Sequence, residues 1–150
     1  MRAVIQRVKK AKVIINDIEE RTIDFGLVVL LGIENNDNKD DVDWLVNKIV
    51  DMRIFNDNSE IMNLSLKDIN GSIMIISQFT LFASIKKGNR PSYINAAKHD
   101  HAIPLYDYFI EKSSAIIKKL LVTGEFGANM QVSLINDGPV TIVIDSKRRE

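Results

Sequence analysis

The sequence predicts an α+β fold in which a curved, mostly antiparallel, barrel-like β-sheet packs with two main helices in a single domain, residues 1–150. Strand patterns cluster at both ends of the chain, and two helical patterns lie between them. No repeat, linker or change of composition divides the 150 residues, which suffice for one sizeable core. These observations favour one compact layered domain.

The N-terminal part is rich in strand patterns. Residues 3–8 and 12–16 have the composition of strands, Asn16-Asp17 favours a turn, and a third short strand is expected around residues 21–24. The near-continuous apolar run 27–33 is typical of a strand buried on both faces. We therefore expect helices to cover both sides of that last strand.

The first helix is predicted from about Asp40, where acidic residues favour a helix N-terminus. Its apolar residues recur at helical spacing: Val42, Leu45, Val46 and Ile49. Residues 56–60 then predict a turn, and residues 72–77 predict a buried strand.

The second helix is predicted to begin near Pro104, since proline suits the first helical turn. Its expected apolar stripe consists of Tyr106, Phe109, Ile110, Ile116, Ile117 and Leu120. Two strands, near residues 130–135 and 140–145, are expected to close the sheet.

Composition restricts the function classes. Twenty basic and twenty acidic residues give no net charge, so any nucleic-acid contact must come from a local basic patch. The chain has no cysteine, which excludes disulfides, a thiol nucleophile and a thiolate metal site. The longest apolar run, residues 27–31, is too short to cross a bilayer, so we expect a cytoplasmic protein without a membrane partner.

Two polar segments interrupt the apolar strands: Ser77-Gln78-Phe79-Thr80 and residues 136–141, Asn-Asp-Gly-Pro-Val-Thr. In the first, the backbone N–H groups of Phe79 and Thr80 are candidates for an oxyanion hole, and the Gln78 amide can both donate and accept. The two hydroxyls also have a plain interpretation, because Ser and Thr often satisfy backbone groups at a strand end.

A base for hydroxyl activation is missing from this neighbourhood. A serine or threonine nucleophile normally needs one, commonly histidine. The only histidines, His99 and His101, lie in a polar stretch that we interpret as a solvated helix entry. A metal site on these two imidazoles is the weaker alternative, and we expect neither a metal nor a cofactor. Charge stabilisation without a base suits an activated ester whose own hydroxyl assists an attacking water.

The two segments resemble the paired signature motifs of the D-aminoacyl-tRNA deacylases. Further family-like segments occur in family order: residues 1–8, Gly32, 62–66, 87–92 and 123–132. The resemblance implies hydrolysis of the ester between a D-amino acid and the 3′ end of tRNA. The 2′-OH of the terminal ribose is expected to assist the attacking water. Whether glycyl-tRNA is also a substrate stays open. The catalytic residues implied are Ser77, Gln78, Phe79 and Thr80. Whether Thr80 forms a covalent intermediate also stays open, although we favour water attack.

The resemblance assigns a chirality filter to Gly138 and Pro139. In the family this dipeptide is cis and enters the active site of the other subunit, which implies a homodimer. The main-chain carbonyls of the dipeptide are expected to engage the substrate amino group and to exclude an L side chain. Arg7 is expected to brace this loop.

By the same resemblance, the terminal adenosine of the CCA end is held by Phe126, Gly127, Ala128 and Met130, which by composition alone would be core residues. Lys86, Lys87 and Arg90 are candidates for tRNA phosphate contacts, although loop cations are usually only solvated. Lys147, Arg148 and Arg149 form a second basic candidate. The main rival function is a non-catalytic tRNA- or DNA-binding module of the same fold; a small-molecule esterase is disfavoured by the missing base.

Overall fold

The computed structural model describes residues 1–149, and its centre is one long bent strand, β1 (Arg2–Ile15). One edge of β1 pairs along its length with β8 (Met130–Asp145), and the other edge pairs first with β3 (Gly26–Gly32) and then with β2 (Glu19–Ile23). The prediction of two strands at residues 3–8 and 12–16 was therefore wrong. Continuous pairing with β8 carries the strand through its polar middle.

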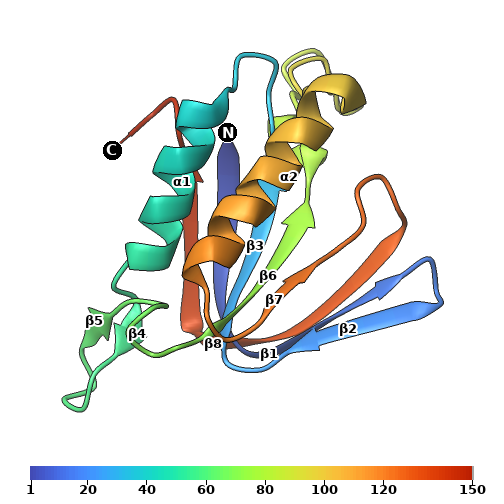
Figure 1. Ribbon diagram of the computed structural model, residues 1–150. Helices are drawn as coiled ribbons and strands as arrows, with labels where there is room; N and C mark the ends of the chain where they lie inside the picture. Colours follow the sequence, from blue (N-terminus) through green and yellow to red (C-terminus); the bar gives the residue numbers. More distant parts are fainter. Residues whose placement is uncertain (150) are drawn as a thin grey trace.

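The sheet is mixed: three of its five strand pairings are antiparallel and two are parallel. Its order is β2-β1-β3-β6-β7, with β8 on the far edge of β1. The strands β6 (Ser72–Ser77) and β7 (Leu121–Thr123) both run parallel to β3, whereas β1 is antiparallel to its three neighbours. The sheet curls into a nearly closed, barrel-like shape (Figure 1). A small hairpin, β4 (Phe55–Asn56) and β5 (Met62–Leu64), lies apart from it.

Both helices lie on the same face of the sheet (Figure 1). One hydrophobic cluster joins α1 (Lys39–Asp51) and α2 (His99–Ile116) to one face of β3. The opposite face of β3 packs on the curled half of the sheet, where Val28 joins a second cluster with Val13 and Ile23. The expectation of helices on both sides of β3 was wrong, because the sheet itself covers the second face.

The two helices begin differently. Asn38 caps α1 and forms a reciprocal capping box with Asp41, close to the predicted start. α2 begins at His99 and places Pro104 inside the helix, so the prediction of a start near Pro104 was wrong. The proline removes a hydrogen bond to the carbonyl of Asp100, a residue that lies exposed in the first turn where water replaces the donor. His99 and His101 therefore belong to the helix.

The two ends of the described chain meet on the same side of the molecule. The ammonium group of Met1 is buried and forms an ion pair with Asp37, and it also donates to Ser146 Oγ at 2.7 Å. Within residues 1–149 no helix is long and apolar enough to span a membrane.

Candidate active site

The first polar segment turns sharply away from the sheet. Ser77 ends β6, and Phe79–Phe82 forms a 3₁₀ turn, η1, directly after it. The N–H of Gln78 donates to the carbonyl of Leu31 on β3 at 2.7 Å. A Cβ at Gly32 would lie 3.0 Å from the Gln78 carbonyl, so the missing side chain allows the turn to approach β3 closely. The strand-end position of this segment was predicted; the 3₁₀ turn was not.

Arg2 holds the far end of η1. Its Nη1 donates to the Leu81 carbonyl at 2.7 Å, its guanidinium lies 4.8 Å from the Phe82 ring centroid, and its Nη2 pairs with Asp145 at 2.9 Å. Burial opposes ionisation of Asp145, but the N–H of Lys147 and the Arg2 guanidinium hold the pKa of Asp145 below its usual value. The turn after Ser77 is thus fixed at both ends.

Within the turn, polar groups are arranged around the Gln78 amide. Gln78 Nε2 donates a hydrogen bond to Thr80 Oγ1. Phe79 and Thr80 stand at the start of η1, where no intrahelical carbonyl is available to their N–H groups, and Gln78 offers no side-chain cap. The ring of Phe79 is 54% exposed and meets Tyr93 edge to face at 5.0 Å. Two backbone N–H groups at the start of the turn therefore have no helical carbonyl to bond, beside the exposed ring of Phe79.

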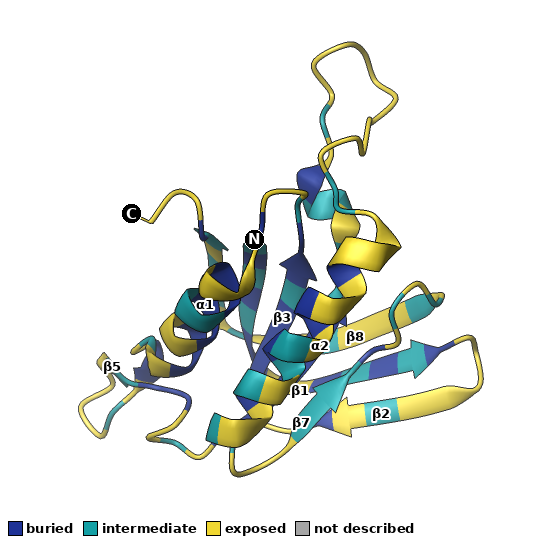
Figure 2. Cartoon of the chain, turned by 45° about the horizontal axis from the view of Figure 1, so that its top comes forward, coloured by how far each residue is buried: buried dark blue, intermediate teal, exposed yellow. Residues whose placement is uncertain are grey.

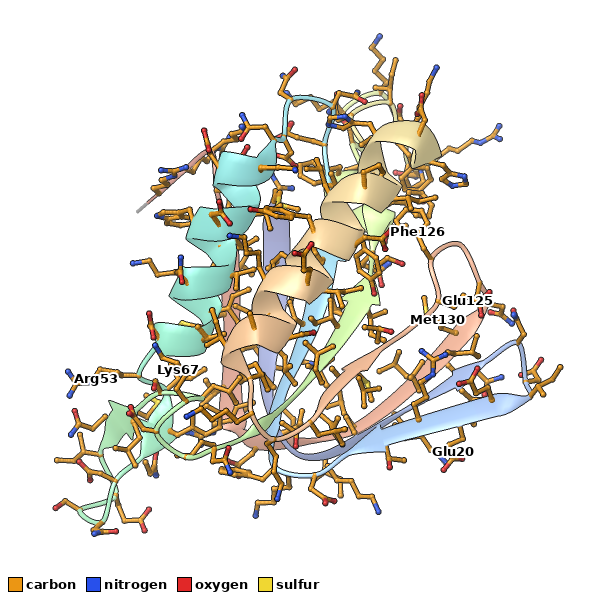
Figure 3. The ribbon with its side chains drawn as sticks, in the orientation of Figure 1. Glu20, Arg53, Lys67, Glu125, Phe126 and Met130 are labelled. Carbon is orange, nitrogen blue, oxygen red and sulfur yellow. The ribbon has the colours of Figure 1, made fainter. Side chains whose placement is uncertain are left out.

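A cavity of about 1020 Å³ opens from this turn. Ser77, Gln78 and Phe79 line one side of it. The other side carries the four residues predicted to hold the adenosine, all from the β7–β8 segment (Figure 3): Phe126, Gly127, Ala128 and Met130. The structure thus brings both groups to one cavity. Thr80 does not line it and reaches it only through Gln78.

Phe126 is held between two other rings. Tyr106 of α2 meets it at 5.7 Å between centroids, and His99 meets it at 5.5 Å with the planes at 89°. The Tyr106 hydroxyl donates to the Ile75 carbonyl of β6 at 2.9 Å, and burial raises the pKa of Tyr106. His99 also lines the cavity. The interpretation of His99 as only a solvated helix entry was therefore incomplete, since α2 begins earlier than its proline indicated.

The second polar segment lies inside β8 and not between two strands, so the prediction of separate strands at 130–135 and 140–145 was wrong. Gln6 pairs with Thr141 and Val8 with Asn136, which leaves residues 137–140 bulged opposite the single residue Arg7. The Gly138–Pro139 peptide bond is cis, and Gly138 has φ +122°. Continuous pairing to β1 holds the strand together around the bulge.

Arg7 braces this bulge from beneath. Its side chain is buried, and Nε lies 2.9 Å from Asp137 Oδ2, an ion pair without hydrogen-bond alignment. Nη1 donates to the Ile54 carbonyl at 2.5 Å. None of Arg7, Gly138 and Pro139 lines the cavity beside Ser77. One chain therefore does not unite its two polar segments.

The predicted phosphate-contact residues lie on an exposed loop. Hydrogen bonds of 2.8 and 2.9 Å between Ser84 and Ser92 close it, and Lys86, Lys87 and Arg90 are all exposed outside the main cavity. Lys86 instead lines a second cavity of about 590 Å³ with Arg2 and the C-terminal cations Lys147 and Arg148.

Sequence reasoning missed three residues that line the main cavity, Tyr93, Lys98 and His99, because they lie outside both motifs. The signal that could have found His99 was the helical pattern extended upstream of Pro104. Among residues 1–149 no group of three or more His, Asp or Glu side chains is placed to hold a metal ion.

Comparison with known proteins decides the family. Residues 4–145 match the sequence profile of the D-Tyr-tRNA(Tyr) deacylase family. The chain belongs to this family. It is 59% identical over its whole length to the full D-aminoacyl-tRNA deacylase of Azobacteroides pseudotrichonymphae genomovar. CFP2, and 56% identical, again over both whole chains, to that of Flavobacterium psychrophilum.

Solved structures share the family fold. A protein described as a c-Myc DNA unwinding element binding protein superposes with a TM-score of 0.90 at 38% identity, covering 97% of this chain and 98% of the other. A probable eukaryotic D-amino acid tRNA deacylase superposes with a TM-score of 0.82 at 16% identity, covering 95% and 97%, which supports the fold alone.

Proposed function

We propose that this protein hydrolyses the ester bond of D-aminoacyl-tRNA, releasing the D-amino acid and free tRNA. The observation that carries the proposal is the turn after β6, whose first backbone N–H groups lack a helical partner and whose residues Gln78 and Phe79 line the same cavity as Phe126 and Met130. The names of the relatives at 59% and 56% identity describe the same activity. Because aminoacyl-tRNA is used by ribosomes, we place the reaction in the cytoplasm.

The chemistry follows from the groups at the turn. The N–H groups of Phe79 and Thr80 stabilise the oxyanion of the tetrahedral intermediate, and such donors are typically worth about 10²–10³ in kcat. Gln78 orients the turn through its bond to Thr80. Water attacks the ester carbonyl with assistance from the 2′-OH of the terminal ribose, the C–O bond to the ribose breaks, and its oxygen takes a proton.

The selectivity for D-amino acids is assigned to Gly138 and Pro139 of a second copy of the chain. β8 pairs with β1 on one side only, and its exposed side chains include Val132, Ile135 and Val143 (Figure 2). An unpaired strand with exposed apolar residues is suited to self-association. A dimer through this edge brings the bulge of one chain to the cavity of the other, where its carbonyls engage the substrate amino group and leave no room for an L side chain.

The tRNA end is recognised in two parts. The terminal adenosine lies against Phe126, Gly127, Ala128 and Met130, and Lys86, Lys87 and Arg90 contact phosphates. No described group is arranged to read a base sequence, so the enzyme acts on many tRNAs through their shared CCA end. Glycyl-tRNA, which has no side chain to exclude, is a second substrate.

The deciding experiment is hydrolysis of D-tyrosyl-tRNA beside L-tyrosyl-tRNA, with a chelator and no added metal. We expect rapid release of D-tyrosine only. Bound but unhydrolysed tRNA in both reactions would instead support a binding module, the function named for the structural relative at 38% identity. Dependence on added metal would contradict the mechanism.

A further inference from the structure

We propose that His99 is a positioning residue that contacts the terminal nucleoside of the bound tRNA and holds the acylated ribose over the turn after β6. The inference rests on the proposed function. His99 lines the same cavity as Ser77 and Gln78, although it lies 22 positions after Ser77 in the sequence. Its ring stands perpendicular to Phe126, the aromatic surface on which the base is placed.

The two histidines of the chain are used differently. His101 Nε2 lies 3.0 Å from the Asp37 carbonyl and is occupied within the protein. The ring nitrogens of His99 have no hydrogen-bond partner within residues 1–149, and the side chain is exposed. A neutral imidazole carries one donor and one acceptor, a combination that suits the polar edge of an adenine or the hydroxyls of a ribose.

The aromatic contacts connect His99 to the catalytic strand. His99 packs on Phe126, Phe126 packs on Tyr106, and the Tyr106 hydroxyl bonds to the carbonyl of Ile75, two residues before Ser77. A nucleoside seated against Phe126, with His99 beside it, is therefore held in fixed register with the end of β6. A contact of this kind strengthens binding of the substrate and of the transition state alike.

His99 is not assigned to proton transfer, because no contact joins it to Ser77, Gln78 or Thr80. Its effect should consequently fall on substrate binding. Loss of one neutral hydrogen bond corresponds to an increase in KM of about fivefold, with kcat changed by less than about twofold. A residue that only supports the fold would lower thermal stability as well.

The test compares His99→Ala, His99→Phe and His99→Gln with D-tyrosyl-tRNA as substrate. Phenylalanine keeps an aromatic contact with Phe126 but lacks the nitrogens, whereas glutamine keeps an amide donor and acceptor. We expect Ala and Phe to raise KM equally and Gln to recover most of the loss. His101→Ala is the matched control, and we expect it to leave KM unchanged.

A second readout does not depend on catalysis. Adenosine 5′-monophosphate titrated into ¹⁵N-histidine-labelled wild-type protein should shift the ring signals of His99 and leave those of His101 in place. An unmoved His99 signal, or a wild-type KM in His99→Phe, would overturn the proposal. Failure of the wild-type enzyme to release D-tyrosine would instead refute the proposed function, and the nucleotide titration would still report on the cavity.

Discussion

The end of β6 and the bulge of β8 carry the two polar motifs of this protein, yet they are built in opposite ways. The turn after Ser77 is held by two hydrogen bonds, from the Gln78 N–H to the Leu31 carbonyl and from Arg2 to the Leu81 carbonyl, and its first residues line a large cavity. The bulge at Gly138 and Pro139 is exposed on an edge strand and lines no part of that cavity. One region contains a space for a substrate, and the other only presents a rigid backbone.

This difference is what the proposed division of work between two copies of the chain would require. The bulge is braced by the buried Arg7, and its residues Gly138 and Pro139 are exposed. The cavity, in turn, is lined by the turn after Ser77 and by Phe126 but by none of the bulge residues. In the proposed dimer, each region supplies what the other lacks.

The largest expected effect comes from inactivating the two regions in separate chains. Gln78→Ala damages the cavity side, and Gly138→Ala damages the bulge, because a Cβ there would lie 2.8 Å from Val140 Cγ2 at φ +122°. We expect each variant alone to lose about 100-fold in kcat, because Gln78→Ala removes part of the cavity wall as well as the bond to Thr80, and Gly138→Ala displaces the bulge. Co-expressed in equal amounts with two affinity tags, they should recover about a quarter of wild-type activity, since half the dimers are mixed and each has one intact site.

The control for this experiment is the mass of each variant by light scattering, which must stay that of the wild type. If the two motifs acted within one chain, every subunit of the mixed dimer would carry a defect and no activity would return. That result would refute the assignment of Gly138 to the partner's site.

The next effect tests how the bulge is held. Arg7→Met leaves Asp137 without its buried partner, and we expect a loss of about 3 kcal/mol in the free energy of unfolding. Activity on D-tyrosyl-tRNA should fall and the ratio of D to L hydrolysis should narrow. The matched control is Lys9→Met, whose exposed ammonium lies 3.9 Å from the same carboxylate and contributes little. Equal destabilisation by both changes in urea denaturation would contradict the bracing role.

A third prediction sharpens the view of the cavity side. If backbone donors carry the chemistry, Thr80→Val removes a hydroxyl that only accepts from Gln78, and activity should fall less than about tenfold. A covalent threonine would instead lose activity by a factor of about 10⁴ or more and would leave a trapped acyl-enzyme in the wild type. Rapid-quench mass spectrometry of the wild type, with Thr80→Ser as the conservative control, distinguishes the two.

Local patterns predicted the strand end in the first region but not the bulge in the second. The apolar strand 72–77 and the polar residues after it follow from side-chain chemistry alone, and the structure places them as expected. The bulge could not be predicted in this way, because it depends on the pairing of β8 with β1, more than a hundred residues away in the sequence. A polar Asn-Asp-Gly-Pro sequence favours a turn unless a partner strand continues past it.

The arrangement around α2 was missed for a related reason. Proline is favoured at a helix start because it has no N–H to donate, but it does not have to stand there. In α2 the helix begins five residues before Pro104, and the exposed first turn tolerates the missing hydrogen bond. The earlier start brings Lys98 and His99 to the cavity. Side chains from distant elements meet at the cavity because the sheet curls. The spacing of residues in the sequence does not predict this curvature.

The smallest expected effect concerns the exposed loop that follows the turn after Ser77. Lys87 lies exposed on the loop closed by Ser84 and Ser92, and it makes no ion pair within residues 1–149. For Lys87→Ala we expect KM for D-tyrosyl-tRNA to rise about twofold at 0.1 M salt, and the slope of log affinity against log salt to fall by about 0.7–0.9. The matched control is Lys48→Ala on α1, whose ammonium lies 5.7 Å from the Trp44 ring. Because D and L substrates share the same phosphates, the ratio of their hydrolysis rates should not change. An unchanged ratio assigns Lys87 to tRNA binding, whereas a changed ratio would place Lys87 at the chirality filter.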